Sequence, residues 1–219
     1  MNNINLDVKR GDKICIVGRS GVGKSTLLRC VNLLEYPSSG DIFFDGKSIL
    51  SKDTDICAIR SKIGMIFQSF NLFSHLTVLK NITLALIHIK KIKKNEAKDI
   101  AMELLKKVGL ESKTLRYPAN LSGGEKQRVA IVRTLALKPK ILLIDEPTSS
   151  LDPKSSREIT TLLSDIVDKN VSMISVSHDM NFVKSFANRI VFMEHGEINH
   201  DGPADEKCAE HIAKLEGIW

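Results

Sequence analysis

Apolar and polar positions follow two different periods along the chain. Ile4, Leu6 and Val8 alternate with polar residues, which predicts a strand. Short apolar runs bounded by polar or turn residues predict further strands near residues 14–17, 41–44, 62–67, 141–144, 171–176 and 189–193. From Lys24 onward, apolar residues recur at helical spacing at Leu27, Leu28, Val31 and Leu34. Strands that alternate with helices predict an α/β fold built on a mostly parallel sheet.

In the middle of the chain, apolar residues recur only at the spacing of a helix. Between residues 69 and 138 no run predicts a strand, and one helix face is marked by Ala97, Ile100, Ala101, Leu104, Leu105 and Val108, before Gly109. We therefore expect residues 1–219 to form a single domain. In it, residues 1–68 and 139–219 form the core, and residues 69–138 form an inserted helical subdomain.

Composition agrees with an ordinary globular protein, because 42% of the 219 residues are hydrophobic and 26% are charged. No apolar stretch approaches the roughly 18 residues of a membrane span, and the start lacks the pattern of a secretion signal. We expect a cytosolic chain. Cys15, Cys30, Cys57 and Cys208 lie far apart, which favours reduced and mostly buried thiols over a zinc site or a disulfide framework.

The net charge of +6 is spread over interleaved lysines and acids, which favours solubility over binding to nucleic acid. One local exception is the basic run Lys90, Lys91, Lys93 and Lys94. It either faces lipid headgroups or flanks a helix in water.

A glycine-rich turn follows the apolar run 14–17 and matches the pattern GxxxxGK[ST] at a strand-to-helix junction. Such a turn lets successive backbone amides converge on phosphate oxygens, and the helix N-terminus adds its partial positive charge. Lys24 is placed to reach the β and γ phosphates, and the Ser25 hydroxyl suits Mg²⁺. The candidate nucleotide-binding residues are Gly18, Arg19, Ser20, Gly21, Val22, Gly23, Lys24, Ser25 and Thr26.

Two adjacent carboxylates end the apolar run 141–144, where a parallel sheet opens to ligands. Asp145 is predicted to hold Mg²⁺, and Glu146 is predicted to polarise the water that attacks the γ phosphate. His178 follows another strand and is a further candidate near that phosphate. Taken alone, an Asp-Glu pair after a strand is as often a helix cap or a solvated turn.

The segment LSGGEKQ at residues 121–127 resembles the signature of ABC-type ATPases. The chain also carries, in the expected order, Gly18 to Ser25, Gln68, Asp145, Glu146, Ser149 to Asp152 and His178. Nearly the whole chain is thus similar to an ABC transporter nucleotide-binding domain. This resemblance implies a P-loop NTPase core of RecA-like type, with N-terminal antiparallel strands and a helical insert.

Ser122 and Glu125 have the spacing of a capping box, which leaves the amides of a helix N-terminus available as a second phosphate cradle. The resemblance implies that Ser122, Gly123 and Gly124 close on the ATP of a partner subunit, in a homodimer or in a pair with a related ATPase. It also implies that Asp152 contributes to nucleotide binding. Gln68 is implied to meet Mg²⁺ and to link the site to a transmembrane permease.

The segments 68–85 and 116–153 are most similar to ATPases of bacterial polar amino acid importers, which implies a periplasmic amino-acid-binding protein as an indirect partner. We expect a place on the inner face of the membrane and no nucleic acid partner. An apolar groove at Phe70, Leu72, Phe73 and Leu76 could receive a permease helix, or these residues could belong to the core of the insert. Another cargo, such as a lipoprotein or a metal, and a non-transport role linked to nucleic acid are the alternatives.

Two departures from the family pattern lie at the ends of the sequence. Family members usually carry two further strands before Ile4, with an aromatic residue that stacks on adenine. Lack of that stacking is expected to weaken ATP binding by roughly 1 to 3 kcal/mol. Either the start lies upstream or the subunit is weakened. The ending KCAEHIAKLEGIW, with Trp219, also differs from amino acid importers.

Overall fold

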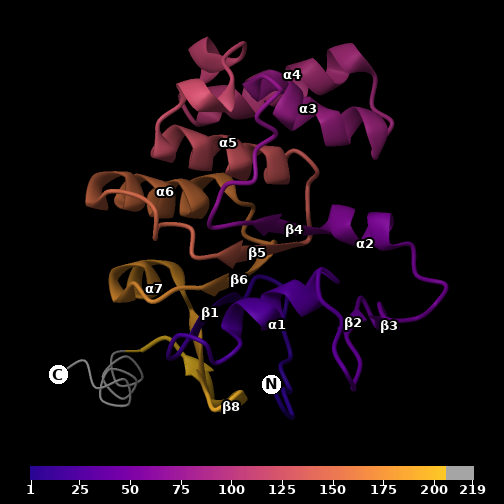
Figure 1. Cartoon of the computed structure of the whole chain (residues 1–219), viewed down its shortest axis with the longest axis vertical. Coiled ribbons are helices and arrows are strands. Elements are labelled where there is room, and N and C mark those ends of the chain that lie inside the picture. Colours follow the sequence, from indigo (N-terminus) through magenta and orange to yellow (C-terminus); the bar gives the residue numbers. More distant parts are fainter. Residues whose placement is uncertain (206–219) are drawn as a thin grey trace.

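The computed structural model describes residues 1–205 and contains a six-stranded sheet in the order β4-β5-β6-β1-β7-β8 (Figure 1). Its strands are β1 (Lys13–Val17), β4 (Ile63–Ile66), β5 (Ile141–Asp145), β6 (Ser172–Val176), β7 (Arg189–Glu194) and β8 (Glu197–Pro203). All neighbours pair in parallel except β7 and β8. This confirms the predicted α/β class and mostly parallel sheet.

The remaining elements are a small hairpin and the helices. The hairpin consists of β2 (Phe43–Phe44) and β3 (Lys47–Ser48). The helices are α1 (Lys24–Val31), α2 (Ile56–Lys62), α3 (Val78–His88), α4 (Lys94–Lys107), α5 (Gly123–Leu135), α6 (Pro153–Ile166) and α7 (Met180–Phe186). Two 3₁₀ turns, η1 (Glu111–Lys113) and η2 (Pro118–Asn120), precede α5.

Alternate residues of each central strand enter different apolar clusters, because successive side chains of a strand point to opposite faces. In β5, Leu143 packs in the cluster that contains Leu28 of α1. Its neighbours Leu142 and Ile144 pack with Ile159 of α6. Both faces are thus covered by helices, which explains why the central strands are continuous apolar runs.

Helices α3, α4 and α5 gather at one end of the molecule and share an apolar cluster that includes Ile82, Ala101 and Val129 (Figure 1). No strand lies between residues 69 and 138, as the sequence predicts. The helix expected to end before Gly109 is α4, and Gly109 itself has the positive φ of 69° that suits a glycine after a helix.

Two strand predictions differ from the structure. Residues 4–8 form no strand, although Ile4, Leu6 and Val8 are half-buried and the residues between them are exposed. The alternation of apolar and polar residues in this segment thus correctly indicates that one face is buried. A strand also requires backbone hydrogen bonds to a neighbouring strand, and within residues 1–205 these residues are not paired in that way. Strand β8 escaped prediction because it is an edge strand of polar residues ending in Pro203, with little apolar pattern.

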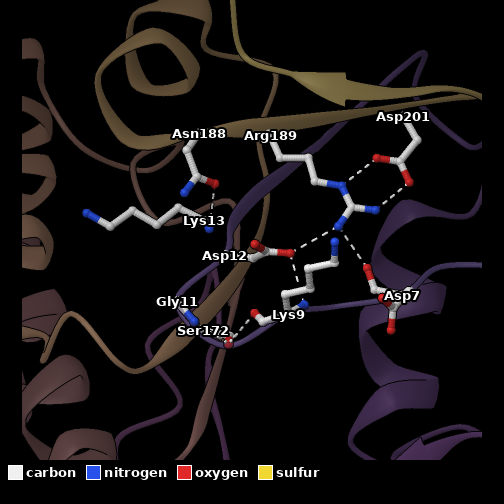
Figure 2. Close-up of polar contacts among 9 residues, drawn as sticks. All are labelled: Asp7, Lys9, Gly11, Asp12, Lys13, Ser172, Asn188, Arg189 and Asp201. Atoms are coloured by element: carbon white, nitrogen blue, oxygen red, sulfur yellow. Dashed lines mark hydrogen bonds and ion pairs between the residues drawn. The ribbon is translucent and has the colours of Figure 1, made fainter.

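A polar network joins the N-terminal segment to the edge of the sheet (Figure 2). The guanidinium of Arg189 in β7 forms hydrogen bonds with both carboxylate oxygens of Asp201 in β8, at 2.5 and 2.6 Å. It also bonds to a carboxylate oxygen of Asp12 and to the carbonyl of Asp7. One side chain thus fixes two strands and the chain that leads into β1.

Three cysteines lie in the described region, and all are free. Cys15 and Cys30 are buried, as expected, whereas Cys57 is exposed. Burial raises the pKa of the Cys15 thiol to about 12. Cys208 and the unusual C-terminal ending, with Trp219, lie outside the described residues. Within residues 1–205, no helix combines the length and apolar character needed to cross a membrane.

Candidate nucleotide site

The turn between β1 and α1 adopts a conformation that only its glycines tolerate without strain. Gly18, Gly21 and Gly23 have φ angles of 140°, 83° and 104°. A Cβ at Gly18 would lie 2.1 Å from the carbonyl oxygen of Met193, so this residue must also lack a side chain. The glycine spacing read from the sequence is therefore required by the backbone path of the turn.

Lys24 begins α1 and its side chain folds back over the turn. The residue is 9% exposed, and its ammonium donates to the carbonyls of Gly18 and Arg19 at 2.5 and 2.8 Å. The positive charge thus lies across the loop. Arg19 and Ser20 are exposed at the tip, whereas Val22 packs against the main core and anchors the loop.

Ser25 and Asp145 come from different elements and meet directly. The Ser25 hydroxyl donates to Oδ1 of Asp145 at 2.7 Å. Asp145 is 6% exposed, and its other oxygen lies 4.0 Å from Arg29. Arg29 was not predicted from the sequence, but it stands four residues after Ser25 and so shares its helix face.

Glu146 and His178 follow neighbouring strands, β5 and β6, and their side chains approach each other. The Glu146 carboxylate lies 3.4 Å from Nδ1 of His178, and its side chain is 25% exposed. Glu146 has a φ of 45°, and its amide donates to the carbonyl of Val176 at the end of β6. A left-handed conformation at a glutamate is strained, and this hydrogen bond holds it in place.

An open pocket of about 920 Å³ lies beside this pair, between the starts of α6 and α7. Glu146, Ser177 and His178 line it at the strand ends, and Thr160 and Phe182 line it from the helices. The glutamate and histidine therefore reach solvent on the side of the sheet that carries α6 and α7.

Gln68 follows β4, whose residue Ile66 is in register with Ile144 of β5. The chain thus leaves the sheet at the same edge as Asp145. The Gln68 side chain is exposed, and no hydrogen bond joins it to another described residue. Gln68 therefore lies at the same edge of the sheet as Asp145 because β4 and β5 are neighbours, and not because its side chain contacts the site.

The predicted capping box is confirmed at the start of α5. The Ser122 hydroxyl accepts from the Glu125 amide at 3.3 Å, and the Glu125 carboxylate accepts from the Ser122 amide at 2.8 Å. Gly123 and Gly124 leave room for Leu151 and Ser155, which come within 3.3 and 3.2 Å of where a Cβ would stand. Within residues 1–205, no hydrogen bond joins this helix start to the turn 18–25.

Asp152 caps a second helix. Its Oδ1 accepts from the amides of Lys154 and Ser155, and its Oδ2 accepts from the Ser155 hydroxyl at 2.6 Å. These bonds lower the pKa of the Asp152 carboxyl, and the bond from the Ser155 hydroxyl has the largest effect. Capping α6 accounts for an aspartate at this position, and its predicted contact with nucleotide remains a prediction.

The donor set around Ser25 fits magnesium better than a metal held by protein alone. No group of three or more His, Cys, Asp or Glu side chains gathers as a metal cage in the described part of the chain. Mg²⁺ in nucleotide sites usually takes one or two protein oxygens and completes its shell with phosphates and water. The Ser25 hydroxyl and the Asp145 carboxylate, 2.7 Å apart, have the chemistry for that role.

Strand β1 of this mostly parallel sheet leads into a three-glycine turn and a helix that begins with Lys24 and Ser25. An acidic pair, Asp145 and Glu146, stands at the carboxyl end of β5. Together these features define a P-loop NTPase. The family model described as ABC transporter matches residues 1–149. The chain therefore belongs to the ABC transporter ATP-binding family.

Its relatives include ATP-binding proteins named for amino acid transport. The glutamine transport ATP-binding protein GlnQ of Geobacillus stearothermophilus is 47% identical over 206 residues, covering 94% of this chain and 85% of the relative. The glutamate/glutamine/aspartate/asparagine transport ATP-binding protein BztD of Rhodobacter capsulatus is 44% identical over 225 residues, covering 99% and 86%.

Solved structures agree with the fold. The ATP-binding cassette MJ0796, in a dimeric post-hydrolysis state bound to ADP and Pi, superposes with a TM-score of 0.83 at 36% identity. The match covers 93% of this chain and 90% of that one.

Proposed function

We propose that this chain is the ATP-hydrolysing subunit of a bacterial ABC importer, and that it powers the uptake of polar amino acids through a separate permease. The observation that carries the proposal is the meeting of Ser25 with Asp145 and of Glu146 with His178 at the carboxyl ends of β5 and β6. The relatives GlnQ and BztD, named for amino acid transport, support the cargo class.

In this proposal the turn 18–25 holds the phosphates of ATP. Its backbone amides and the α1 N-terminus bind phosphate oxygens, and Lys24 turns from the loop carbonyls to the β and γ phosphates. Thr26, at the third position of the helix, adds a phosphate contact. Mg²⁺ bound at Ser25, Asp145 and Gln68 would neutralise phosphate charge.

Glu146 is the proposed general base. It accepts a proton from the attacking water, and His178, 3.4 Å away, orients the carboxylate and contacts the γ phosphate. The Glu146 carboxylate faces His178 and the pocket beside α6 and α7, whereas the Asp145 carboxylate accepts from Ser25. This arrangement separates the base from Asp145, although the two carboxylates are adjacent in sequence.

A complete site needs a second subunit. Ser122, Gly123 and Gly124 present helix amides at a position that makes no hydrogen bond with the phosphate turn of the same chain within residues 1–205. We propose that they bind the γ phosphate held by the partner, an identical chain or a related ATPase, with Asp152 nearby. The dimeric state of MJ0796 supports this assembly.

The same proposal divides the chain into a nucleotide-binding core, residues 1–68 and 139–219, and an inserted helical subdomain, residues 69–138. The permease docks between them, close to Phe70, Leu72, Phe73 and Leu76, on the inner face of the membrane. A periplasmic amino-acid-binding protein delivers the substrate, and nucleic acid plays no part.

Replacing Glu146 with glutamine tests the catalytic assignment. The variant should bind MgATP and accumulate as an ATP-dependent dimer, while turnover falls about 10²- to 10⁴-fold, the usual contribution of a general base. Glu197→Gln, an exposed change on β8, is the control and should hydrolyse ATP normally. Normal turnover in Glu146→Gln would remove this residue from the mechanism.

Copurification tests the transport assignment. A permease and a periplasmic amino-acid-binding protein should accompany the tagged chain when it is isolated with its membrane partners. A lipid-handling or metal-handling partner would overturn the amino acid cargo, and ATPase activity that nucleic acid stimulates would favour a non-transport role.

A further inference from the structure

One arginine holds the loop that joins β4 to α3, residues 67–77. Arg133 in the last turns of α5 donates to two consecutive carbonyls of this loop. Its Nη1 lies 2.6 Å from the carbonyl oxygen of Asn71, and its Nη2 lies 3.1 Å from that of Phe70. Figure 1 shows the chain between β4 and α3 passing beside α5.

The two residues that Arg133 holds are both in a left-handed conformation. Phe70 has a φ of 62° and Asn71 a φ of 49°. Asparagine tolerates this region, but a bulky phenylalanine does not enter it without an external constraint. Two charge-assisted hydrogen bonds to the adjacent carbonyls supply that constraint.

The far end of the loop is fixed separately, from α3. Asn81 is 1% exposed and accepts from the Phe73 amide at 2.8 Å. Its amide group donates to the carbonyls of Phe73, Leu76 and Thr77 at 3.1 Å. These bonds hold Phe73, 44% exposed, in a defined place, while Arg133 supplies hydrogen bonds from α5 to the loop.

Helix α5 connects this loop to the signature segment. From Ser122 at its N-terminus to Arg133 the helix spans 11 residues, about 16 Å at the rise of an α-helix. The same end of α5 packs on β4, where Thr134 donates to the Met65 carbonyl at 3.4 Å. Because an α-helix is rigid, a displacement of the start of α5 is transmitted along the helix to the residues that follow Gln68.

We propose that Arg133 is a positioning residue that ties the β4–α3 loop to α5, so that nucleotide capture at Ser122 and movement of the loop occur as one unit. The coupling rests on the proposed function, because it requires the start of α5 to bind the partner's ATP. The holding of the loop does not depend on that function.

The experiment compares Arg133→Lys with a matched control elsewhere in the chain. Lysine keeps the charge but cannot bridge two carbonyls with one rigid fork. Arg60 provides the control, because it also donates to two consecutive carbonyls, those of Asn32 and Leu33, and Leu33 has a φ of 55°. Arg60→Lys removes an equivalent contact to residues 32 and 33, which lie outside the loop 67–77.

Backbone amide hydrogen exchange of the full chain, followed by mass spectrometry, measures the loop directly. Without nucleotide, Arg133→Lys should speed exchange in residues 68–73 about tenfold, and Arg60→Lys should leave it unchanged. With MgATP, wild type should show slower exchange in the same segment. Arg133→Lys should lose that slowing while its Kd for MgATP stays within about twofold of wild type.

Equal loop exchange in the two variants overturns the holding role, and persistent MgATP-dependent slowing in Arg133→Lys overturns the coupling. Arg133→Gln, which retains one amide group, replaces the lysine variant if that variant does not fold, and the same results are expected. If wild type fails to bind MgATP, the proposed function fails, whereas the comparison without nucleotide still decides the role of Arg133.

Discussion

Replacing Gly18 with alanine adds a methyl group where the backbone leaves no space. The new Cβ would stand 2.1 Å from the Met193 carbonyl oxygen and 3.1 Å from its carbon, so β7 or the phosphate turn must move. The φ of 140° is also unfavourable for a residue with a side chain. Gly21 provides a matched comparison in the same turn, because its φ is 83° but a Cβ there meets nothing within 4 Å.

The two substitutions separate backbone strain from steric overlap. The positive φ costs about 1–2 kcal/mol in either variant. Overlap with a packed strand adds about 1–3 kcal/mol for Gly18→Ala alone, which gives a total of about 2–5 kcal/mol. For a domain of this size the melting temperature should fall by about 10 °C for Gly18→Ala and about 4 °C for Gly21→Ala.

Urea and thermal unfolding of the purified chain without nucleotide measure the difference. Equal midpoints for the two variants would refute the reasoning, because they would show that β7 yields to the methyl group at no cost. A loss for Gly21→Ala as large as that expected for Gly18→Ala would show that backbone strain dominates the turn.

Two further predictions concern charge and capping. Asp201→Asn should lower stability near neutral pH by about 1–2 kcal/mol, because it removes the carboxylate charge and one of the two bonds to Arg189 (Figure 2). Arg189 lowers the pKa of Asp201, so this stabilisation is full above the ordinary Asp pKa of about 3.9 and is lost as pH falls further. Urea titrations from pH 3 to 7 should show the gap between wild type and variant closing in acid, and a constant gap would contradict the assignment. Ser122→Ala should cost about 1 kcal/mol by removing the cap of α5, and unchanged urea unfolding would argue against that cap.

The candidate site divides into residues that local sequence could place and residues that needed the fold. Local rules sufficed for the glycine turn, for Lys24 and Ser25, and for the capping box at Ser122, since each depends on neighbours a few positions away. The contact between Ser25 and Asp145 spans 120 positions, and sequence reasoning reached it only through the rule that parallel strands open at one edge.

Arg133 shows where such rules stop. It looks like any helix arginine in the sequence, and its partners are carbonyls 62 and 63 positions away in an irregular loop. Strand β8 and the hydrogen bonds of Arg189 were not predicted either. The residues of this edge strand are mostly polar, so they show no regular spacing of apolar positions.

The sequence by itself determined five strands of the sheet, the phosphate turn and the helical stretch between residues 69 and 138, because hydrophobic period, glycine spacing and capping act over short range. The tertiary structure decided which strand ends lie together, why residues 4–8 form no strand, and which side chain holds the loop after β4. These depend on hydrogen-bond partners brought together by packing of distant segments, which no local pattern specifies.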